Sequence, residues 1–273
     1  MGQNENAYCS SDSSCELKSC RKEDHKEEKV YMKFFKQMFA DRFYCDKTDC
    51  QINYIDDRDK QLDGIDFEMC YPVFIDDCYV RNVDAKSQLK QYIGRPTKTF
   101  CLEINSFQKG VLRNGWFVED NKTDLYMFSW IHKVSNDCYD EDAKRFVIND
   151  YKDIKIMEIM FVEVKKLKKT LNNMGLTSEF LLRAAENMRN KKCECLYFDL
   201  YNKRLLTKEQ AGNDYKKYTF KLVKSNRFVE SPVLLVIKKD FYESICSSHY
   251  ILKEKGIVIK KLYNKLIDKH IDF

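Results

Sequence analysis

Three short segments of strand-like sequence each carry a carboxylate, and one of them also carries a lysine. The acids are Asp66, Asp84 and Glu103, and Lys86 follows Asp84 by two residues. Because side chains alternate between the two faces of a strand, Asp84 and Lys86 are expected on one face and Ala85 on the other. Clustered carboxylates are the oxygen ligands that Mg²⁺ prefers, and a nearby ammonium group can orient an attacking water or offset negative charge on a phosphate. The pattern predicts the site of a metal-dependent phosphodiesterase.

This arrangement resembles the PD-(D/E)XK nuclease superfamily, in which a first acid precedes a hairpin and the second strand carries an acid-x-Lys pattern. The resemblance implies that Asp66 and Asp84 are the first and second acids and that Lys86 is the lysine of the motif. Glu103 would then lie on the third strand as an additional acid. Asp63 is a competing first acid. The chain departs from the family pattern in that no proline precedes Asp66, where the sequence reads Gly-Ile-Asp.

Later segments also look like a group of uncharacterised phage and mobile-element members of this superfamily. They are residues 115–130, which begin Gly-Trp-Phe, and residues 162–167 and 231–239, so the resemblance covers roughly residues 30 to 273. It implies a nuclease encoded by a phage or mobile element that hydrolyses phosphodiester bonds, with DNA as the expected substrate. It also implies Mg²⁺ as the cofactor, with Mn²⁺ able to substitute.

In the implied site, the metal ligands are Asp66, Asp84 and Glu103. Lys86 would complete the catalytic set by positioning the nucleophile or neutralising developing charge. Like-charged acids that converge repel one another unless a cation or a proton is present, so their convergence needs a reason, and a metal supplies one.

A second class of function stays open beside the enzyme. A nuclease-like fold can serve as a non-catalytic module that binds nucleic acid, or that binds a host defence protein as an inhibitor. Retention of the acids and the lysine favours catalysis, and the sequence contains no phosphate loop, nucleophile elbow or His-Glu-x-x-His zinc motif. Nucleic acid is the expected partner and no membrane contact is expected, whereas a protein partner, a homodimer, the choice of DNA or RNA and the cleavage specificity are left open.

Composition indicates one main globular domain. The 273 residues are 44% hydrophobic and 14% aromatic, which is ample for a packed core, and only 8 Gly and 3 Pro argue against long linkers. Residues 1–28 are polar and are expected to form a flexible N-terminal segment. Residues 29–273 are expected to form a single nuclease-like domain, with a C-terminal extension from about residue 154.

Charge and cysteine usage bear on partners and compartment. The net charge of +5 is compatible with nucleic-acid binding without demanding it. The start of the chain has no apolar signal-peptide core, and no segment approaches the roughly 18 uninterrupted apolar residues of a membrane span. A cytoplasmic location with reduced thiols is therefore expected for the 12 cysteines.

Other metal-ligating residue types have weaker patterns. The series Cys9, Cys15, Cys20 and His25 lacks the Cys-x-x-Cys spacing that places two zinc ligands on one turn, and the pairs Cys45 with Cys50 and Cys193 with Cys195 are isolated. Zinc binding is not favoured at any of them. His132, on an expected strand, could act as a general base or could be structural.

The spacing of apolar residues predicts the helices and strands that carry the candidate site residues. Apolar residues at helical spacing predict an opening helix over 28–43, and period-two patterns predict strands over 64–70, 79–86, 99–104 and 124–134. Two further helices are expected over 162–174 and 178–189, the second capped by Thr177 or Ser178. Later strands are expected over 191–198, 220–223, 232–238 and 256–259. The expected fold class is α/β, a restriction-endonuclease-like mixed sheet flanked by helices with a C-terminal α+β extension.

Overall fold

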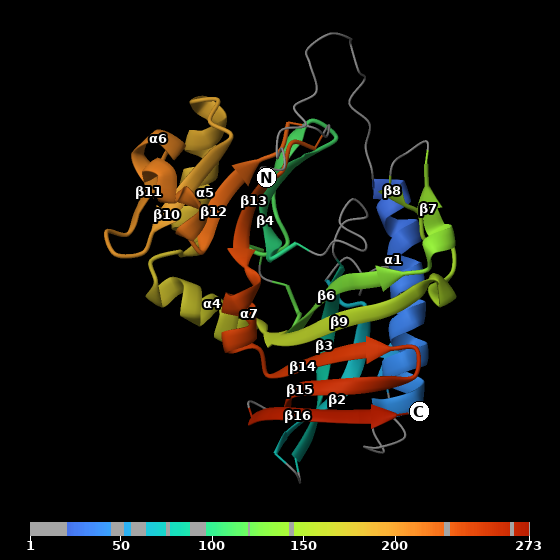
Figure 1. The fold of residues 1–273 in the computed structure, drawn as a ribbon. Coiled ribbons are helices and arrows are strands. Elements are labelled where there is room, and N and C mark those ends of the chain that lie inside the picture. The colour runs from blue at the N-terminus through green and yellow to red at the C-terminus, as the bar shows by residue number, and fades with distance from the viewer. Residues whose placement is uncertain are drawn as a thin grey trace.

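A computed structural model shows two β-sheets with helices packed on them (Figure 1). The structure describes residues 21–44, 52–55, 64–74, 77–87, 97–119, 121–141, 145–226, 230–262 and 265–272. Several residues singled out above lie outside this description: Cys9, Cys15, Cys20, Cys45, Cys50, Asp63 and the side chain of His25.

The larger sheet has eight strands and is mixed, as expected for this fold class. In spatial order the strands are β1 (Ile52–Tyr54), β2 (Phe67–Phe74), β3 (Asp77–Ser87), β6 (Leu125–Val134), β9 (Ile154–Glu163), β14 (Ser248–Lys253), β15 (Gly256–Leu262) and β16 (Lys265–Asp272). Only β3 and β6 pair in parallel; the other neighbours are antiparallel.

The smaller sheet has six strands, all antiparallel. Their order is β11 (Arg204–Leu206), β10 (Cys195–Asp199), β12 (Phe220–Lys224), β13 (Val233–Lys238), β4 (Thr99–Gln108) and β5 (Val111–Asn114). A two-stranded ribbon of β7 (Tyr139–Asp140) and β8 (Arg145–Phe146) stands apart from both sheets.

The expected helices are present. The opening helix runs as α1 (Arg21–Phe35) and continues as a π-helical segment, η1 (Lys36–Tyr44). The other α-helices in the described residues are α4 (Val164–Asn173), α5 (Ser178–Asn190), α6 (Lys208–Ala211) and α7 (Lys239–Ile245), and the 3₁₀ turns are η3 (Asn136–Cys138), η4 (Tyr151–Asp153) and η5 (Gly212–Lys217). Thr177 is the N-cap of α5, because its hydroxyl accepts a hydrogen bond from the Phe180 N–H at 3.1 Å.

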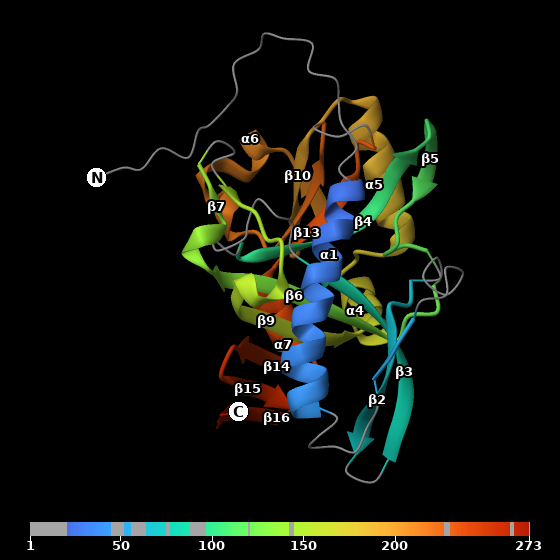
Figure 2. The same ribbon diagram turned by 90° about the vertical axis from the view of Figure 1, so that its right-hand side faces the viewer.

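The middle strands of the larger sheet, β6 and β9, are buried on both faces, which explains why they are apolar at successive positions. On β6, Leu125, Met127 and Ile131 pack in one core with α1 and η1, whereas Phe128 and Trp130 pack in the core shared with the smaller sheet. Figure 2 shows α1 lying across the strands of the larger sheet. The face away from α1 therefore looks toward the smaller sheet and its helices.

The chain after residue 154 is divided between the two sheets. It supplies β9, β14, β15 and β16 to the larger sheet and β10 to β13 to the smaller one. β9 pairs with β6 near the middle of the larger sheet. The sequence predicts that residues from about 154 form an extension of the main domain. In the structure, β9, β14, β15 and β16 are instead part of the same sheet as β3.

Strand β4 also lies where the resemblance did not indicate. It pairs with β5 and β13 in the smaller sheet, and not with β3. The parallel pairing of β3 with β6 requires a crossover connection, and the β4–β5 hairpin is part of that connection. Glu103 on β4 is thereby carried away from the sheet of Asp84.

The described cysteines include both free and disulfide-bonded residues. Among the described residues, Cys101, Cys138, Cys193, Cys195 and Cys246 have free thiols, as expected, whereas Cys70 is disulfide-bonded, contrary to the expectation of reduced thiols throughout. In the described part of the chain, no helix is long and apolar enough to cross a membrane.

Candidate active site

Strand β3 presents Asp84 and Lys86 on the face that looks toward the smaller sheet. Val83 and Ala85 are buried in the core beside α1. Because side chains alternate along a strand, Asp84 and Lys86 point to the opposite face. The parallel register aligns Asp84 with Tyr126 and Lys86 with Phe128 of β6. The expected placement of the acid and the lysine on one strand face is confirmed.

Asp66 is held against β3 by its own backbone and side chain. Its N–H donates to the Val83 carbonyl oxygen at 2.9 Å, and its carboxylate Oδ2 accepts from the Ala85 N–H at 2.7 Å. These two bonds fix the segment before β2 beside the end of β3. The Asp66 carboxylate consequently lies close enough to Asp84 to raise the pKa of that second acid.

The carboxylate of Asp84 is buried and only partly satisfied. The residue is 2% exposed; its Oδ1 lies 2.7 Å from Lys86 Nζ, and its Oδ2 has no hydrogen-bond partner. Burial, opposed by Lys86 and reinforced by Asp66, raises the pKa of Asp84 to about 7. A buried, unpartnered carboxylate oxygen is costly, because the oxygen has lost its water without gaining a donor.

Gly64 makes room beside this oxygen. Its φ of +77° is the left-handed conformation that glycine adopts without strain, and an added Cβ would lie 3.6 Å from Asp84 Oδ2 and 3.1 Å from Thr123 Oγ1. Thr123 holds the turn by donating to the Gly64 carbonyl at 2.8 Å. The side-chain carbonyl oxygen of Asn121 is also buried without a partner, and the Asn121 amide nitrogen lies 3.2 Å from the same Cβ position.

Lys86 is enclosed by an aromatic ring and two acids. Its Nζ lies 4.9 Å from the centroid of the Trp116 ring, and Trp116 in turn packs on Tyr126 with ring centroids 5.1 Å apart. Burial acts to lower the pKa of Lys86, but the charges of Asp84 and Asp66 outweigh it and raise that pKa above its ordinary value. The ammonium group is therefore fixed and charged at neutral pH.

Glu103 is linked to the site through the backbone. Its carboxylate Oε1 accepts from the Ser106 hydroxyl at 2.9 Å, and no contact between this carboxylate and Asp66, Asp84 or Lys86 occurs in the structure as described. The Phe117 N–H donates to the Glu103 carbonyl at 3.3 Å, which places the Glu103 backbone beside the segment that carries Trp116. Among the described residues, no three His, Cys, Asp or Glu side chains form a group that could hold a metal ion.

The structure thus brings together three of the four site residues expected from the sequence and adds neighbours that sequence reasoning did not assign. These neighbours are Trp116, whose ring covers Lys86, and Asn121, whose side chain lies beside Gly64. The sequence signal for Trp116 is the preceding glycine: a Cβ on Gly115 would meet the Glu103 carbonyl oxygen at 2.3 Å, so the backbones must touch there.

Comparisons with protein-family models, with curated proteins and with solved structures found no match for this chain. The structure itself defines an α/β protein with a mixed sheet, and a polar site built from β3, the segment before β2, and the Trp116 segment.

Proposed function

We propose that the protein is a Mg²⁺-dependent nuclease that hydrolyses phosphodiester bonds, with DNA as its substrate. The observation that carries the proposal is the convergence of Asp66, Asp84 and Lys86, in which a buried carboxylate oxygen lacks a partner. The choice of DNA, and an origin in a phage or mobile element, rest on the resemblance to PD-(D/E)XK nucleases.

The residues present fit a hard divalent cation in part. Two carboxylates lie side by side and one has an oxygen without a hydrogen-bond partner. Burial and the neighbouring Asp66 raise the pKa of Asp84, and a cation beside these acids would favour their charged forms. Asp66 and Asp84 would hold Mg²⁺ or Mn²⁺, whereas Glu103, the third acid of the resemblance, is bonded to Ser106 and makes no contact with them in the structure as described. When bound, such a cation supplies Lewis-acid polarisation of the scissile phosphate and activation of water.

The chain's own groups have separable roles in this proposal. The Lys86 ammonium stabilises negative charge on the phosphate or orients the attacking water, and Asp84 and Trp116 hold it in place. Asp66 is oriented by the Ala85 N–H, which leaves its other oxygen for the cation. Burial strengthens each of these charges relative to their effect in water.

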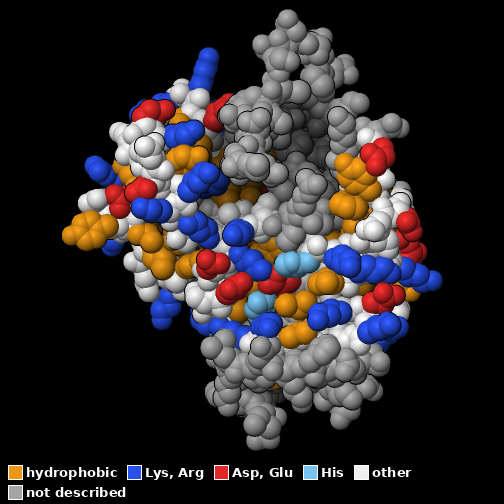
Figure 3. Space-filling model, viewed as in Figure 1, with side chains coloured by type: hydrophobic (Ala, Val, Ile, Leu, Met, Phe, Trp, Pro, Cys, Tyr) orange, Lys and Arg blue, Asp and Glu red, His pale blue; other side chains and the backbone are white. Residues whose placement is uncertain are grey.

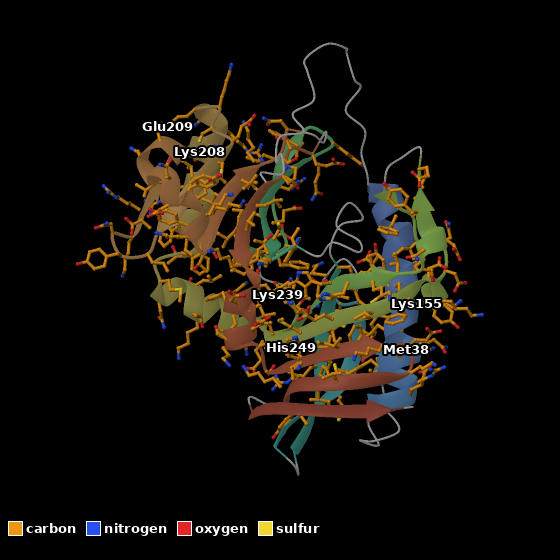
Figure 4. All side chains as sticks on the ribbon, viewed as in Figure 1. Met38, Lys155, Lys208, Glu209, Lys239 and His249 are labelled. Atoms are coloured by element: carbon orange, nitrogen blue, oxygen red, sulfur yellow. The ribbon has the colours of Figure 1, made fainter. Side chains whose placement is uncertain are left out.

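The test is cleavage of DNA with Mg²⁺ or Mn²⁺, with and without a chelator. Asp84→Ala and Lys86→Ala should each lose about 100-fold or more in rate, the scale for one transition-state electrostatic contact. Lys208→Ala, on α6 at the far end of the smaller sheet (Figure 4), is the matched control and should cleave like the wild type. Activity that resists the chelator, or wild-type rates in both site variants, would remove the proposal.

One observation favours a binding protein as the second candidate. Lys86 Nζ directly contacts Asp84 Oδ1 at 2.7 Å, so the lysine already neutralises one of the acids. A panel of single-stranded, duplex and branched DNA and RNA separates the two candidates when both cleavage and retention are scored. If the protein retains nucleic acid without cleaving it, and retention weakens steeply with salt, it is a nucleic-acid binder. If it neither cleaves nor retains any member of the panel, it is a protein-binding module.

A further inference from the structure

Three polar side chains meet beside Gly64, at the edge of the candidate active site. Measured from the position that a Cβ on Gly64 would take, Thr123 Oγ1 lies at 3.1 Å, Asn121 Nδ2 at 3.2 Å and Asp84 Oδ2 at 3.6 Å. The three polar atoms therefore border one region of space, which we call the Gly64 cradle. The cradle exists because residue 64 is a glycine, since any other side chain would occupy it.

Backbone hydrogen bonds hold the two segments that form the cradle. The Thr123 hydroxyl donates to the Gly64 carbonyl oxygen at 2.8 Å, which ties the segment before β6 to the turn before β2. The same segment is bonded to β3, because the Asp124 N–H donates to the Asn82 carbonyl at 2.9 Å and the Asn82 side-chain amide donates to the Lys122 carbonyl at 2.9 Å. The polar atoms of the cradle are thereby positioned by the larger sheet.

The three atoms offer two acceptors and one donor. Asp84 Oδ2 is buried, has no hydrogen-bond partner within the described residues, and accepts. Thr123 Oγ1 gives its hydrogen to Gly64, so its lone pairs accept as well. Asn121 Nδ2 carries two hydrogens, and its bond to the Trp116 carbonyl oxygen at 3.4 Å uses one of them. The second amide hydrogen is left as a donor.

Water is the ligand that matches this set of partners. A water molecule donates two hydrogen bonds and accepts others, and ordered waters inside proteins have two to four polar partners. A cation inside the cradle would face the amide hydrogens of Asn121, and a phosphate oxygen would face the carboxylate of Asp84. A carboxylate oxygen has two lone pairs, so Asp84 Oδ2 can accept from the water and still serve as a ligand to a cation.

Asp84 connects the cradle to Lys86. Its Oδ1 lies 2.7 Å from Lys86 Nζ, whereas its Oδ2 borders the cradle, so the two oxygens of one carboxylate serve different partners. Lys86 is also held beneath the Trp116 ring, which keeps its ammonium on the Oδ1 side. A phosphate that contacts Lys86 is therefore separated from the cradle by a single carboxylate group. This arrangement leaves the charge of the phosphate to Lys86 and the orientation of a water to Asn121.

We infer that the Gly64 cradle holds the attacking water of the proposed phosphodiester hydrolysis and that Asn121 positions this water. The inference rests on the proposed function. The Asn121 N–H donates to the water oxygen, and the water donates to Asp84 and Thr123, which leaves one lone pair of the water for attack. In the reaction, the water oxygen forms a bond to phosphorus, the bond from phosphorus to the leaving oxygen breaks, and one proton passes from the water through solvent to the leaving oxygen.

Two glycine substitutions separate the cradle from backbone strain. Gly64 and Gly110 have nearly the same φ, +77° and +78°, but a Cβ on Gly110 meets no atom within 4 Å. Gly64→Ala fills the cradle and should lower kcat for DNA cleavage with Mg²⁺ about 100-fold at unchanged KM, the scale for a misplaced reactant. Gly110→Ala carries the same strain and should keep the wild-type kcat. Wild-type kcat in Gly64→Ala would overturn the inference.

Asn121→Leu removes the amide and keeps a side chain of similar shape. It should lower kcat about tenfold or more, the scale for loss of one hydrogen bond to the reacting water, and should leave KM and DNA retention in chelator unchanged. Asn213→Leu, at an exposed position of η5, is the matched control and should behave as the wild type. A loss of DNA retention that accounts for the slower cleavage of Asn121→Leu would contradict the positioning role.

A crystal structure of the full chain in chelator gives a readout that does not depend on activity. The wild type should show an ordered water within hydrogen-bond distance of Asp84 Oδ2 and Asn121 Nδ2, and Gly64→Ala should lack it. No ordered water in the wild type would overturn the inference. A wild type that cleaves no DNA removes the proposed function and this inference with it, whereas full cleavage by both cradle variants removes the inference alone.

Discussion

At the scale of single residues, Asp84 shows how burial and a neighbouring acid act together. The pKa of Asp84, raised to about 7, lies above that of the same group in the unfolded chain, about 4. Between these values the folded state holds a proton that the unfolded state has released. The contribution of Asp84 to folding is therefore complete below about pH 4 and is lost as pH rises to about 7.

The first prediction follows from this loss of stability with rising pH. The free energy of unfolding of the wild type should fall, relative to that of Asp84→Asn, by at most about 1.4 kcal/mol per pH unit between pH 4 and pH 7. Urea denaturation of both proteins across this range measures the difference. Parallel stability curves would show that the buried acid does not titrate as its surroundings indicate.

The contribution of Glu158 to stability changes with pH in the opposite direction, and this gives the second prediction. Burial acts against ionisation of its carboxylate, but contacts with His132, His249 and Lys239, which form the Glu158 cluster with it, outweigh burial and hold its pKa far below its ordinary value. Figure 3 shows the two histidines at the surface among acidic and basic side chains.

The lowered pKa of Glu158 means that its stabilisation is present above the unfolded value, about 4.3, and is lost only as pH falls below it. At neutral pH, Glu158→Gln should cost about 3–5 kcal/mol, because the partners of a buried anion lose their counter-charge. Chemical denaturation measures this loss.

Glu254→Gln is the matched control for that measurement. Glu254 pairs with Lys155 at 3.4 Å on the surface, and its side chain is more than half exposed, so its loss should cost less than about 1 kcal/mol. Similar losses in the two variants would mean that the Glu158 cluster is solvated like an ordinary surface pair.

At the scale of elements, the β4–β5 hairpin and the segment after it connect Glu103 to the candidate site. Gly115 follows β5 and lies against the Glu103 backbone, and the next residue, Trp116, covers Lys86. The hairpin itself turns at Gly110, whose φ is +78° and which has open space around it. Two glycines in one connection thus serve different purposes.

The third prediction compares these two positions. Gly110→Ala should cost about 1 kcal/mol, the strain of a side chain in the left-handed region. Gly115→Ala should cost more and should also lower DNA cleavage, because a Cβ at 2.3 Å from the Glu103 oxygen forces the backbone and Trp116 to move. Thermal denaturation and the cleavage assay together measure both effects; equal losses in the two variants would contradict this role for Gly115.

At the scale of the whole molecule, the two sheets place the paired acids inside a folded interior. The larger sheet is covered by α1 and η1 on one face and by the smaller sheet with its helices on the other, and the acids point into the second layer. A cation that binds there binds only the folded chain, since Asp66 and Asp84 meet through strand pairing. Binding is thereby coupled to global stability.

The fourth prediction is a metal-dependent rise in melting temperature. At a concentration of Mg²⁺ or Mn²⁺ about 100 times Kd, the stabilisation should be about 2.7 kcal/mol. The rise should disappear in Asp84→Ala and persist in Lys208→Ala. An equal rise in wild type and Asp84→Ala would place the cation elsewhere in the chain.

Local residue patterns were sufficient to predict the features that depend on short-range physics. The alternation along β3 put Asp84 and Lys86 on one face, and Thr177 marked the start of α5. These features depend on neighbouring residues, through the two-residue repeat of a strand and the need of a helix end for an acceptor.

The pairing of the strands and the meeting of charged side chains depend on the fold as a whole. It placed Glu103 in the smaller sheet, gave β9 and β14 to the larger sheet, and gathered His132, Glu158 and His249 from three strands. Glu158 is 26 residues from His132 and 91 residues from His249 along the chain. Strand pairing over such separations is set by burial of the sheet faces, which no local pattern contains. The polar sites of this protein follow from that long-range pairing.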